Sequence, residues 1–383
     1  MATVVISPFN VANFPEGGGH FWVYLQYALG LCQLGCEVYW LESLGPQGDS
    51  DQAAARVAEF TERLDQFGLG KKYILYFDRP LEHGTRKHHY INVSRSEAEG
   101  IFRRADLLLN FHYAISPELL SLFRRTALVD IDPGLLQFWM SRRQLNVPCH
   151  DLYFTTGETV GAPAARVPDC GVPWIYVRPP VSLEYWPYVF EPRCHTFTTV
   201  STWDSSDWVV DGEAEYENTK RVAFLEFVDL PRLTSQPLEL ALFLRTARDM
   251  AEWKDLQERG WRIRQSREVA ATTETYQAYI QGSRGEFGCA KPSCLRFQNA
   301  WISDRTLCYL ASGKPVVVQD TGPSSFLPNG EGLFRFSALQ EAAESFSIIN
   351  SDYERHCRAA REIAETFFDS KRVIETILNR ALA

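Results

Sequence analysis

The chain has 383 residues, which is more than one hydrophobic core usually takes, so its length predicts two domains. Hydrophobic residues make up 45% and charged residues 23% of the sequence, and these values argue against a disordered chain. The formal net charge of -9 argues against a broad basic surface for nucleic acid, although it leaves room for a local basic site.

The sequence carries no signal for membrane insertion, secretion or a disulfide framework. It contains no run of eighteen apolar residues, and its start, MATVVISPFN, lacks the basic residues and long apolar stretch of a signal peptide. Its nine cysteines are odd in number and form no C-x-x-C pair. We therefore expect a reduced, cytoplasmic protein without a transmembrane segment or a structural zinc site.

Strand-like and helix-like segments alternate along the first part of the chain. Residues 3–7 predict a strand, the glycine-containing loop 9–19 follows, and residues 21–34 predict a helix that ends at Gly35. This alternation indicates a parallel sheet covered by helices. The further strands are expected at residues 37–41, 72–77, 106–110, 127–131 and 152–155, with a helix at 51–67.

A proline-rich segment separates this part from the next. Seven prolines fall between residues 162 and 192, a density that opposes both helix and central strand. We therefore expect an irregular connector between two domains. The histidines of the charged segment 86–89, before this connector, are expected in a solvated loop.

A second alternating set follows the connector, and the chain is expected to be helical from residue 339 onward. Both halves together predict an α/β protein with two doubly wound, Rossmann-like domains facing across a cleft, where ligands bind beyond the carboxyl ends of the strands. The second set of strands is expected at residues 197–200, 238–244, 261–263, 287–290, 315–319 and 333–336, with helices at 219–228, 247–259, 273–280 and 301–311.

The loop before the first helix is a candidate ligand site. Gly18 and Gly19 would let backbone amides approach an anion or a sugar at the helix N-terminus, and His20 is a candidate catalytic residue that could accept a proton. A flexible turn with a structural histidine is the alternative. The loop matches neither G-x-G-x-x-G nor a P-loop, so a dinucleotide or ATP site is not predicted.

The second half contains an ordered series of motifs. Residues 283–288 read S-R-G-E-F-G, and Gly313 lies 25 residues further on in L-A-S-G-K-P-V-V-V. This region resembles the donor-binding domain of retaining GT-B glycosyltransferases of the family-4 or "group 1" type. The segment W-I-S-D-R at residues 301–305 and the opening G-G-G-H-F-W are similar to an uncharacterised bacterial branch of that superfamily.

The resemblance implies a fold and an activity. The fold would be GT-B, with an acceptor-binding domain at residues 1–185, a nucleotide-sugar-binding domain at 186–365, and a C-terminal helix at 366–383 that packs back on the first domain. The activity would be transfer of a sugar from a UDP- or other NDP-sugar to a hydroxyl or amine of a small-molecule or glycan acceptor. Transfer would retain the anomeric configuration and need neither metal nor cofactor.

Several side chains could bind the negatively charged diphosphate of such a donor, because cations and helix N-terminal amides stabilise a departing anion. Glu286 could accept hydrogen bonds from sugar or ribose hydroxyls, or it could be a solvated loop carboxylate. Arg305 could instead be a surface arginine or a partner of Asp304. The candidate cations are Lys220, Arg284, Lys291 and Arg305, and the expected neighbouring loop residues are Ser201, Thr202, Trp203, Ser303, Thr321 and Gly322.

Two further features bear on the predicted site: a cysteine in place of a glutamate in the second half, and a pair of aspartates in the first half. Related enzymes usually carry a second glutamate five residues before the glycine of A-x-G-x-P, and here Cys308 holds that position. In the first half, Asp130 and Asp132 follow a predicted strand and could orient an acceptor or His20, or they could form an ordinary turn. Their D-x-D spacing lies in the half that should not bind the donor, so no metal is expected.

Other functions stay open. The missing glutamate allows a catalytically silent protein that binds nucleotides or sugars, and nucleotide-sugar epimerases share the two-domain form. Glycosylation of a nucleic-acid base is disfavoured by the acidic balance but not excluded. A homodimer is also open.

Overall fold

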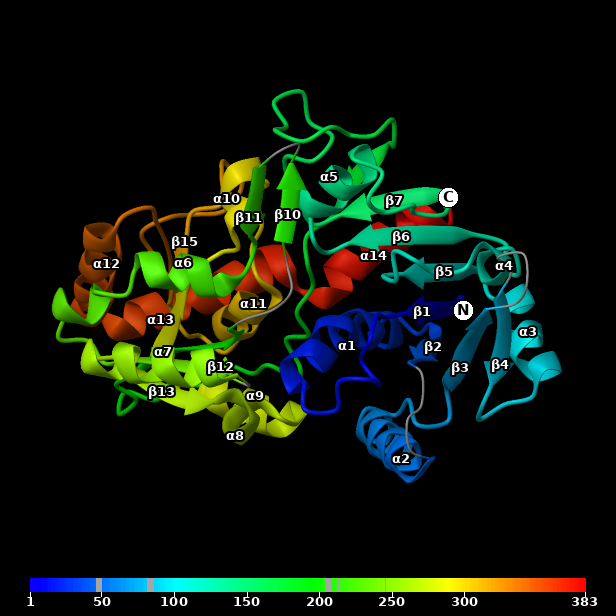
Figure 1. Ribbon diagram of the computed structural model, residues 1–383, viewed down its shortest axis with the longest axis horizontal. Coiled ribbons are helices and arrows are strands. Elements are labelled where there is room, and N and C mark those ends of the chain that lie inside the picture. Colours follow the sequence, from blue (N-terminus) through cyan, green and yellow to red (C-terminus); the bar gives the residue numbers. More distant parts are fainter. Residues whose placement is uncertain (46–49, 81–85, 204–207, 212–213, 245) are drawn as a thin grey trace. The chain divides into compact units, whose positions relative to one another are not determined.

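A computed structural model describes residues 1–45, 50–80, 86–203, 208–211, 214–244 and 246–383 (Figure 1). The chain divides into two compact units. Unit 1 comprises Met1–Gly161, Val167–Pro180 and Ser370–Ala383, and unit 2 comprises Ala162–Arg166 and Val181–Asp369. The domain limits that the resemblance implies, at residues 185 and 365, stay a prediction. The compact units describe how residues pack, and they do not show which segments fold independently.

Unit 1 contains one eight-stranded sheet in the order β4-β3-β2-β1-β5-β6-β7-β8. All its strand pairs are parallel except β3 with β4, so the expected parallel sheet is confirmed. The strands are β1 (Thr3–Ser7), β2 (Glu37–Leu44), β3 (Tyr73–Pro80), β4 (Arg86–Tyr90), β5 (Leu107–Asn110), β6 (Thr126–Asp130), β7 (Leu152–Thr155) and β8 (Trp174–Tyr176).

The central strands of this sheet are mostly apolar and are buried along almost their whole length, because helices cover both faces of the sheet. Every residue of β5 and β6 is buried, and β1 is buried from Val4 onward. The covering helices are α1 (Gly18–Gln33), α2 (Ser50–Gln66), α3 (Arg95–Arg104), α4 (Pro117–Leu120), α5 (Leu135–Ser141) and α14 (Ser370–Ala381).

Two strands of this sheet lie where the sequence predicts none. Residues 86–89, expected in a solvated loop, belong to edge strand β4, and His88 Nε2 lies 2.7 Å from Ser116 Oγ. Strand β8 lies inside the proline-rich connector, which is therefore not wholly irregular. Proline is compatible with a strand at the edge of a sheet, and both strands occupy edges.

The C-terminal helix α14 belongs to unit 1 and packs against α1 (Figure 1). The contact needs a glycine, because a Cβ atom at Gly30 would lie 2.6 Å from Ile374 Cγ1. The return of the last helix to the first unit, expected from the resemblance, is thus confirmed.

Unit 2 contains a six-stranded parallel sheet in the order β13-β12-β9-β14-β15-β16 and a separate antiparallel hairpin, β10–β11. The strands are β9 (Phe197–Thr202), β10 (Trp208–Asp211), β11 (Ala214–Glu217), β12 (Leu238–Phe243), β13 (Arg262–Gln265), β14 (Gly285–Gly288), β15 (Val316–Gln319) and β16 (Leu333–Phe336). The helices are α6 (Lys220–Glu226), η2 (Leu230–Arg232), α7 (Ala247–Glu258), α8 (Ser266–Ala270), α9 (Thr273–Gln281), α10 (Pro292–Phe297), α11 (Asp304–Ala311), α12 (Leu339–Ser351), α13 (Tyr353–Ile363) and η3 (Ala364–Phe368).

Aromatic packing centres the core of unit 2 on β14. The Phe287 ring stacks on the Phe336 ring with centroids 5.5 Å apart, and Phe197 packs against Phe346. Gly285 admits the Phe197 ring, since a Cβ atom there would lie 2.4 Å from Phe197 Cε1. The position of β14 in the sheet is therefore fixed by its packing.

Each sheet has one topological switch point, where successive strands begin to be added on the opposite side. It lies between β1 and β5 in unit 1 and between β9 and β14 in unit 2. Ligands of open parallel sheets bind outside the carboxyl ends of the strands at such points. The residues that follow these four strands are therefore candidates for ligand binding.

No helix in the described part of the chain is long and apolar enough to span a membrane.

Candidate functional site

A pocket of unit 2 opens beside its switch point. It encloses about 430 Å³ of empty space, counted with its open mouth. The end of β14 and the start of α11 form much of its wall. Its polar lining side chains are Ser303, Arg305, Thr306, Gln319, Thr321 and Arg335.

Arg305 bridges the two strands of the switch point. Its Nε donates to Glu286 Oε1 on β14 at 2.6 Å, and its Nη1 donates to the Val200 carbonyl on β9 at 2.8 Å. The side chain is 8% exposed and Glu286 is fully buried. Gly288 makes room for the guanidinium, because a Cβ atom there would lie 3.0 Å from Arg305 Nη2. The arginine is therefore fixed in place before any ligand binds.

Lys220 and Lys291 add positive charge next to Arg305. The pKa of Lys220 is lowered to about 7, first by burial and then by the charges of Arg305 and Lys291. Its ammonium group lies 5.7 Å from the centroid of the Trp301 ring. Asn218 accepts the Ser293 N–H at 2.9 Å and so ties the segment before Lys220 to the helix after Lys291. Three cations thus gather near one buried carboxylate, an arrangement suited to an anionic ligand.

The pocket also contains a helix N-terminus. Helix α11 begins at Asp304, not near Trp301 as expected, so Arg305 is its second residue. The N-cap residue Ser303 makes no capping hydrogen bond with its side chain. The first N–H groups of a helix have no partner within the helix and favour an anion.

The loop before α11 has an unusual backbone held by specific contacts. Gln298 and Ala300 have positive φ angles of 50° and 55°, which non-glycine residues seldom adopt. Thr321 fixes this loop: its carbonyl accepts the Ala300 N–H at 3.0 Å, and its hydroxyl donates to the Trp301 carbonyl at 2.6 Å. Thr321 therefore lines the pocket and shapes it.

Glu286 does not have the environment expected of a residue that binds sugar hydroxyls. One carboxylate oxygen accepts from Arg305, and the other is buried without a hydrogen-bond partner among the described residues. Since the side chain is fully buried, its contact with solvent is lost. The geometry makes Glu286 a residue that holds Arg305 in place.

Arg284 lies away from the other cations. It precedes β14, whereas the pocket lies at the carboxyl end of that strand, four residues or roughly 13 Å away. Its Nε donates to Asn350 Oδ1 at 2.7 Å and its guanidinium stacks 3.9 Å from the Tyr353 ring centroid. The expectation that Arg284 joins the diphosphate site is not supported by this position.

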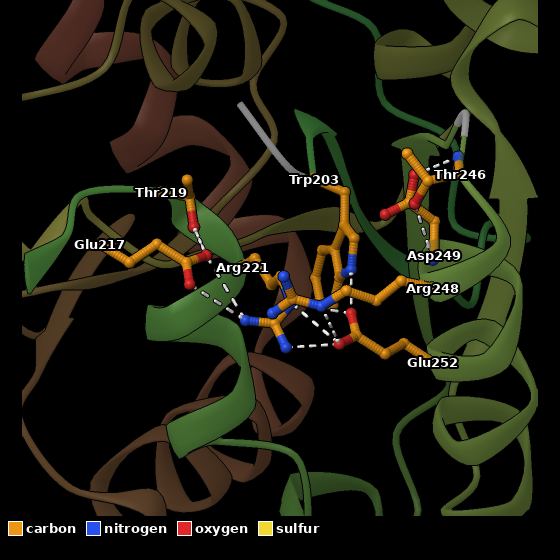
Figure 2. A network of polar contacts seen from close by, with 8 residues as sticks. All are labelled: Trp203, Glu217, Thr219, Arg221, Thr246, Arg248, Asp249 and Glu252. Carbon is orange, nitrogen blue, oxygen red and sulfur yellow. Dashed lines mark hydrogen bonds and ion pairs between the residues drawn. The ribbon is translucent and has the colours of Figure 1, made fainter. Parts of the chain in front are cut away.

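Trp203 is part of a polar network rather than an open binding surface (Figure 2). The indole is 1% exposed, and its Nε1 donates to Glu252 Oε2 at 2.7 Å. Glu252 also pairs with Arg221, whose other partner is Glu217 at 3.4 Å. The network joins the end of β9, the base of the β10–β11 hairpin and helices α6 and α7. Because Arg221 follows Lys220 directly, it fixes the start of the helix that carries this lysine.

The remaining predicted residues of unit 2 have mixed placements. Ser201 is buried and its hydroxyl donates to the Thr202 carbonyl at 2.9 Å, while Thr202 itself is exposed at the end of β9. Gly322 adopts φ of 123°, and a Cβ atom there would lie 2.7 Å from the Gln298 carbonyl oxygen. Gly322 therefore supports the loop before α11. Cys308 is buried, with its Sγ 3.4 Å from the Asp304 carbonyl oxygen.

In unit 1, His20 lies in the first turn of α1, which begins at Gly18 and continues through Gly19. Its Nε2–H donates to the Phe9 carbonyl at 2.9 Å. Because a carbonyl oxygen only accepts, Nδ1 is the ring nitrogen that can take up a proton. Burial lowers the pKa of His20, so the ring is neutral at neutral pH.

Asp130 is not placed as a catalytic residue. It is fully buried, and its carboxylate accepts from Gln137 Nε2 and Thr155 Oγ1, both at 2.8 Å, and from Tyr113 Oη at 3.2 Å. Burial raises the pKa of Asp130 to about 6. Its charge acts on the turn after β6, whereas the exposed Asp132 is the carboxylate that raises the pKa of His20.

Two features of the site were not found from the sequence. Trp301 was assigned to a helix, and no local pattern shows that its ring faces a lysine. The ring of His112 lies 5.0 Å from the Phe9 ring, which no local pattern shows either. Both contacts join segments far apart in the chain, and only the second pair, which follows two strand ends, had a signal in the sequence.

The chain was also compared with known proteins. No protein-family model matches it, and no curated protein matches its sequence. Its fold is similar to an alpha-glucosyltransferase in complex with UDP and DNA, with a TM-score of 0.63 and 12% identity over 100% of both chains. It is also similar to the Anabaena protein HepE in complex with UDP-glucose, with a TM-score of 0.60 and 12% identity over 99% of both chains.

A third similar structure is the sucrose-phosphate synthase of Thermosynechococcus elongatus, with a TM-score of 0.59 and 11% identity over 100% of this chain and 99% of that one. The three structures cover both units of this chain. The predicted GT-B fold, with two Rossmann-like units, is thereby confirmed.

Proposed function

We propose that this protein is a glycosyltransferase that moves a sugar from a UDP-linked or other nucleoside-diphosphate donor to an acceptor hydroxyl or amine. The observation that carries the proposal is the convergence of Lys220, Lys291 and Arg305 at the switch point of unit 2. Solved structures with the same fold hold UDP or UDP-glucose, which favours a uridine donor.

Unit 2 would bind the nucleotide, with the diphosphate against these cations and the N-terminus of α11. Negative charge grows on the diphosphate as the sugar leaves, and donors fixed in advance stabilise that charge most effectively. Arg305 meets this condition, since Glu286 and the Val200 carbonyl hold its guanidinium. Lys220, with a pKa of about 7, would become fully protonated when the anion arrives. The hydroxyl of Ser303 is assigned to the same anion.

Unit 1 would bind the acceptor, and His20 would contact the transferred sugar through Nδ1. We propose a retaining reaction, as the resemblance implies, with the cations of unit 2 in the role that a metal ion has in other transferases. Retention can be read from the anomeric configuration of the product by NMR. An inverting outcome would instead make His20 the general base.

A thermal-shift panel of UDP, GDP, dTDP and ADP tests the nucleotide site. At a concentration of 100 times Kd, a bound nucleotide stabilises the folded chain by about 2.7 kcal/mol, so one member of the panel should raise Tm clearly. Arg305→Ala should abolish the shift, while Arg284→Ala, at the opposite end of β14, serves as the matched control and should keep it. A panel without any shift would contradict the proposal.

Activity separates the proposed enzyme from its rivals. Release of free UDP from UDP-glucose separates an enzyme from a binding protein, and formation of a glycosylated acceptor identifies a transferase. Binding without release would identify a silent binding protein. Interconversion of free nucleotide sugars without net UDP release would identify an epimerase.

A further inference from the structure

The switch point of unit 1 carries aromatic rings instead of cations. Phe9 lies two residues after β1 and His112 lies two residues after β5, so the two rings flank this switch point. Their centroids are 5.0 Å apart and their planes are inclined by 35°. Phe9 is 49% exposed, although it follows a strand whose last four residues are buried. An exposed aromatic ring therefore lies where open sheets bind their ligands.

The backbone that presents this ring is held by a buried carboxylate. Glu42 on β2 is fully buried and accepts the Val11 N–H at 2.9 Å and the Trp40 Nε1–H at 3.0 Å. The backbone N–H groups of Asn10 and Ala12 also donate to it. Asn10 adopts a positive φ of 62°, which lets successive N–H groups converge on one anion. The segment after Phe9 is thus fixed before any ligand arrives.

The same segment also connects Phe9 to His20. The Phe9 carbonyl accepts the Nε2–H of His20, and the His20 ring is packed edge-on against Tyr24 at 5.3 Å between centroids. The carboxylate that acts on His20 is that of Asp132, which is exposed. A ligand on Phe9 would therefore meet an aromatic face, a neutral imidazole and a negative charge.

These three features favour a neutral, hydroxyl-bearing ring. The apolar C–H face of a pyranose covers an aromatic ring, while its hydroxyls donate to an imidazole nitrogen or a carboxylate. A polyanion would meet the Asp132 charge and a chain of net charge -9.

We propose that Phe9 is an acceptor-binding platform, on which the apolar face of a neutral pyranose ring stacks with its hydroxyls toward His20 and Asp132. This inference rests on the proposed glycosyltransferase function. It names the acceptor as a saccharide and Phe9 as a residue that determines specificity.

The test uses the full-length chain with the nucleotide sugar whose nucleotide gives the largest thermal shift. The acceptor probes are methyl α-D-glucopyranoside, methyl β-D-galactopyranoside and methyl α-D-mannopyranoside, with glycerol as a non-ring polyol and a single-stranded DNA oligomer as the polyanion. Release of the corresponding nucleoside diphosphate is measured with and without each probe. At least one pyranoside should accelerate release, while glycerol and DNA should not.

Substitutions then locate the acceptor. Phe9→Ala should raise the KM for the active pyranoside about five- to tenfold, and Phe9→Tyr, which keeps the ring, should stay within about twofold. The KM for the donor is measured in both variants, so that a change in donor binding is distinguished from a change in acceptor binding. Phe190→Ala, which removes a ring that is 39% exposed in unit 2, is the matched control and should leave all values unchanged.

Failure of this inference is distinguishable from failure of the proposed function. If no nucleotide binds and no donor is cleaved, the function itself is wrong. If the donor is cleaved but Phe9→Ala leaves the acceptor KM unchanged, or only DNA accelerates UDP release, the platform is wrong and the transferase stands. Saturation-transfer NMR of the pyranoside with wild type and Phe9→Ala provides a readout that does not depend on turnover.

Discussion

The two switch points of this protein share one topology and differ in chemistry. In unit 2 the residues around the carboxyl ends of β9 and β14 include Lys220, Lys291 and Arg305. In unit 1 the residues after β1 and β5 present Phe9 and His112, with His20 beside them. The sheet order therefore decides where a ligand can bind, and the few residues beyond the strand ends decide which ligand it is.

Two buried carboxylates, one in each unit, differ in a similar way. Glu286 is paired with Arg305 at 2.6 Å, whereas Asp130 accepts from the neutral side chains of Gln137 and Thr155 and has a raised pKa of about 6. A buried charge pair needs both partners, because removing one leaves the other uncompensated. In unit 2 the buried carboxylate of Glu286 holds the cation Arg305 at the switch point. In unit 1 the buried carboxylate of Asp130 stabilises the turn after β6.

The largest expected effect comes from removing a cation at the switch point of unit 2. Arg305→Ala should weaken UDP binding about hundredfold and lower the free energy of unfolding by about 3–5 kcal/mol, because Glu286 is left buried and unpaired. Titration calorimetry and chemical denaturation measure the two effects. The double variant Arg305→Met with Glu286→Gln should regain most of the stability without regaining UDP binding. Recovery of both would show that the arginine has only a structural role.

The next largest effect is expected at the switch point of unit 1, where His20 lies beside the aromatic rings. His20→Ala should lower the rate of sugar transfer about hundredfold, because a positioned polar group at the reacting sugar is lost. UDP affinity should stay within about twofold, since the nucleotide is assigned to unit 2. Single-turnover kinetics with UDP titration separates the two quantities. A parallel loss of UDP affinity would contradict the proposal that unit 2 binds the nucleotide and unit 1 binds the acceptor.

A pH titration probes the charge state of Lys220. Its pKa in the folded chain without ligand is about 7, and a bound diphosphate favours the protonated amine. UDP affinity should therefore be constant well below pH 7 with respect to this group, and it should fall by about tenfold in total as the pH rises from 7 to 9 and the amine loses its charge. Terminal phosphates, with a pKa of about 6, are ionised throughout this range.

Matched variants identify the group behind that pH dependence. Lys220→Arg should keep most of the affinity and lose the dependence, because arginine stays charged. Lys220→Met should lower the affinity about tenfold at pH 7 and also lose the dependence. An unchanged slope in Lys220→Arg would assign the titration to another group.

The smallest expected effect on ligand binding comes from Trp203. Trp203→Phe removes its hydrogen bond to Glu252 and should lower the free energy of unfolding by about 1–2 kcal/mol. UDP affinity should change less than about twofold, because the indole is buried in the network of Figure 2. A large loss of UDP affinity with normal stability would show that Trp203 contributes to the donor site, as the sequence predicts.

The sequence predicted the fold well because the signals for it are local. Apolar runs such as those of β5 and β6 predict central strands of a parallel sheet, and glycines mark helix ends. The edge strands β4 and β8 were missed, because edge positions tolerate the charged and proline-rich sequences that oppose a central strand.

Of the site, the sequence by itself determined the types of residue and their places after predicted strands and before predicted helices. It also identified the first loop and the motifs from residue 283 onward. The tertiary structure decided which of these residues meet. It brings Lys220, Lys291 and Arg305 together, buries Glu286 and Asp130, and sets Arg284 at the other end of β14. The reason is physical: strand patterns depend on neighbours in the chain, whereas charge pairing, burial and ring contacts depend on residues that are distant in the chain and adjacent only after folding.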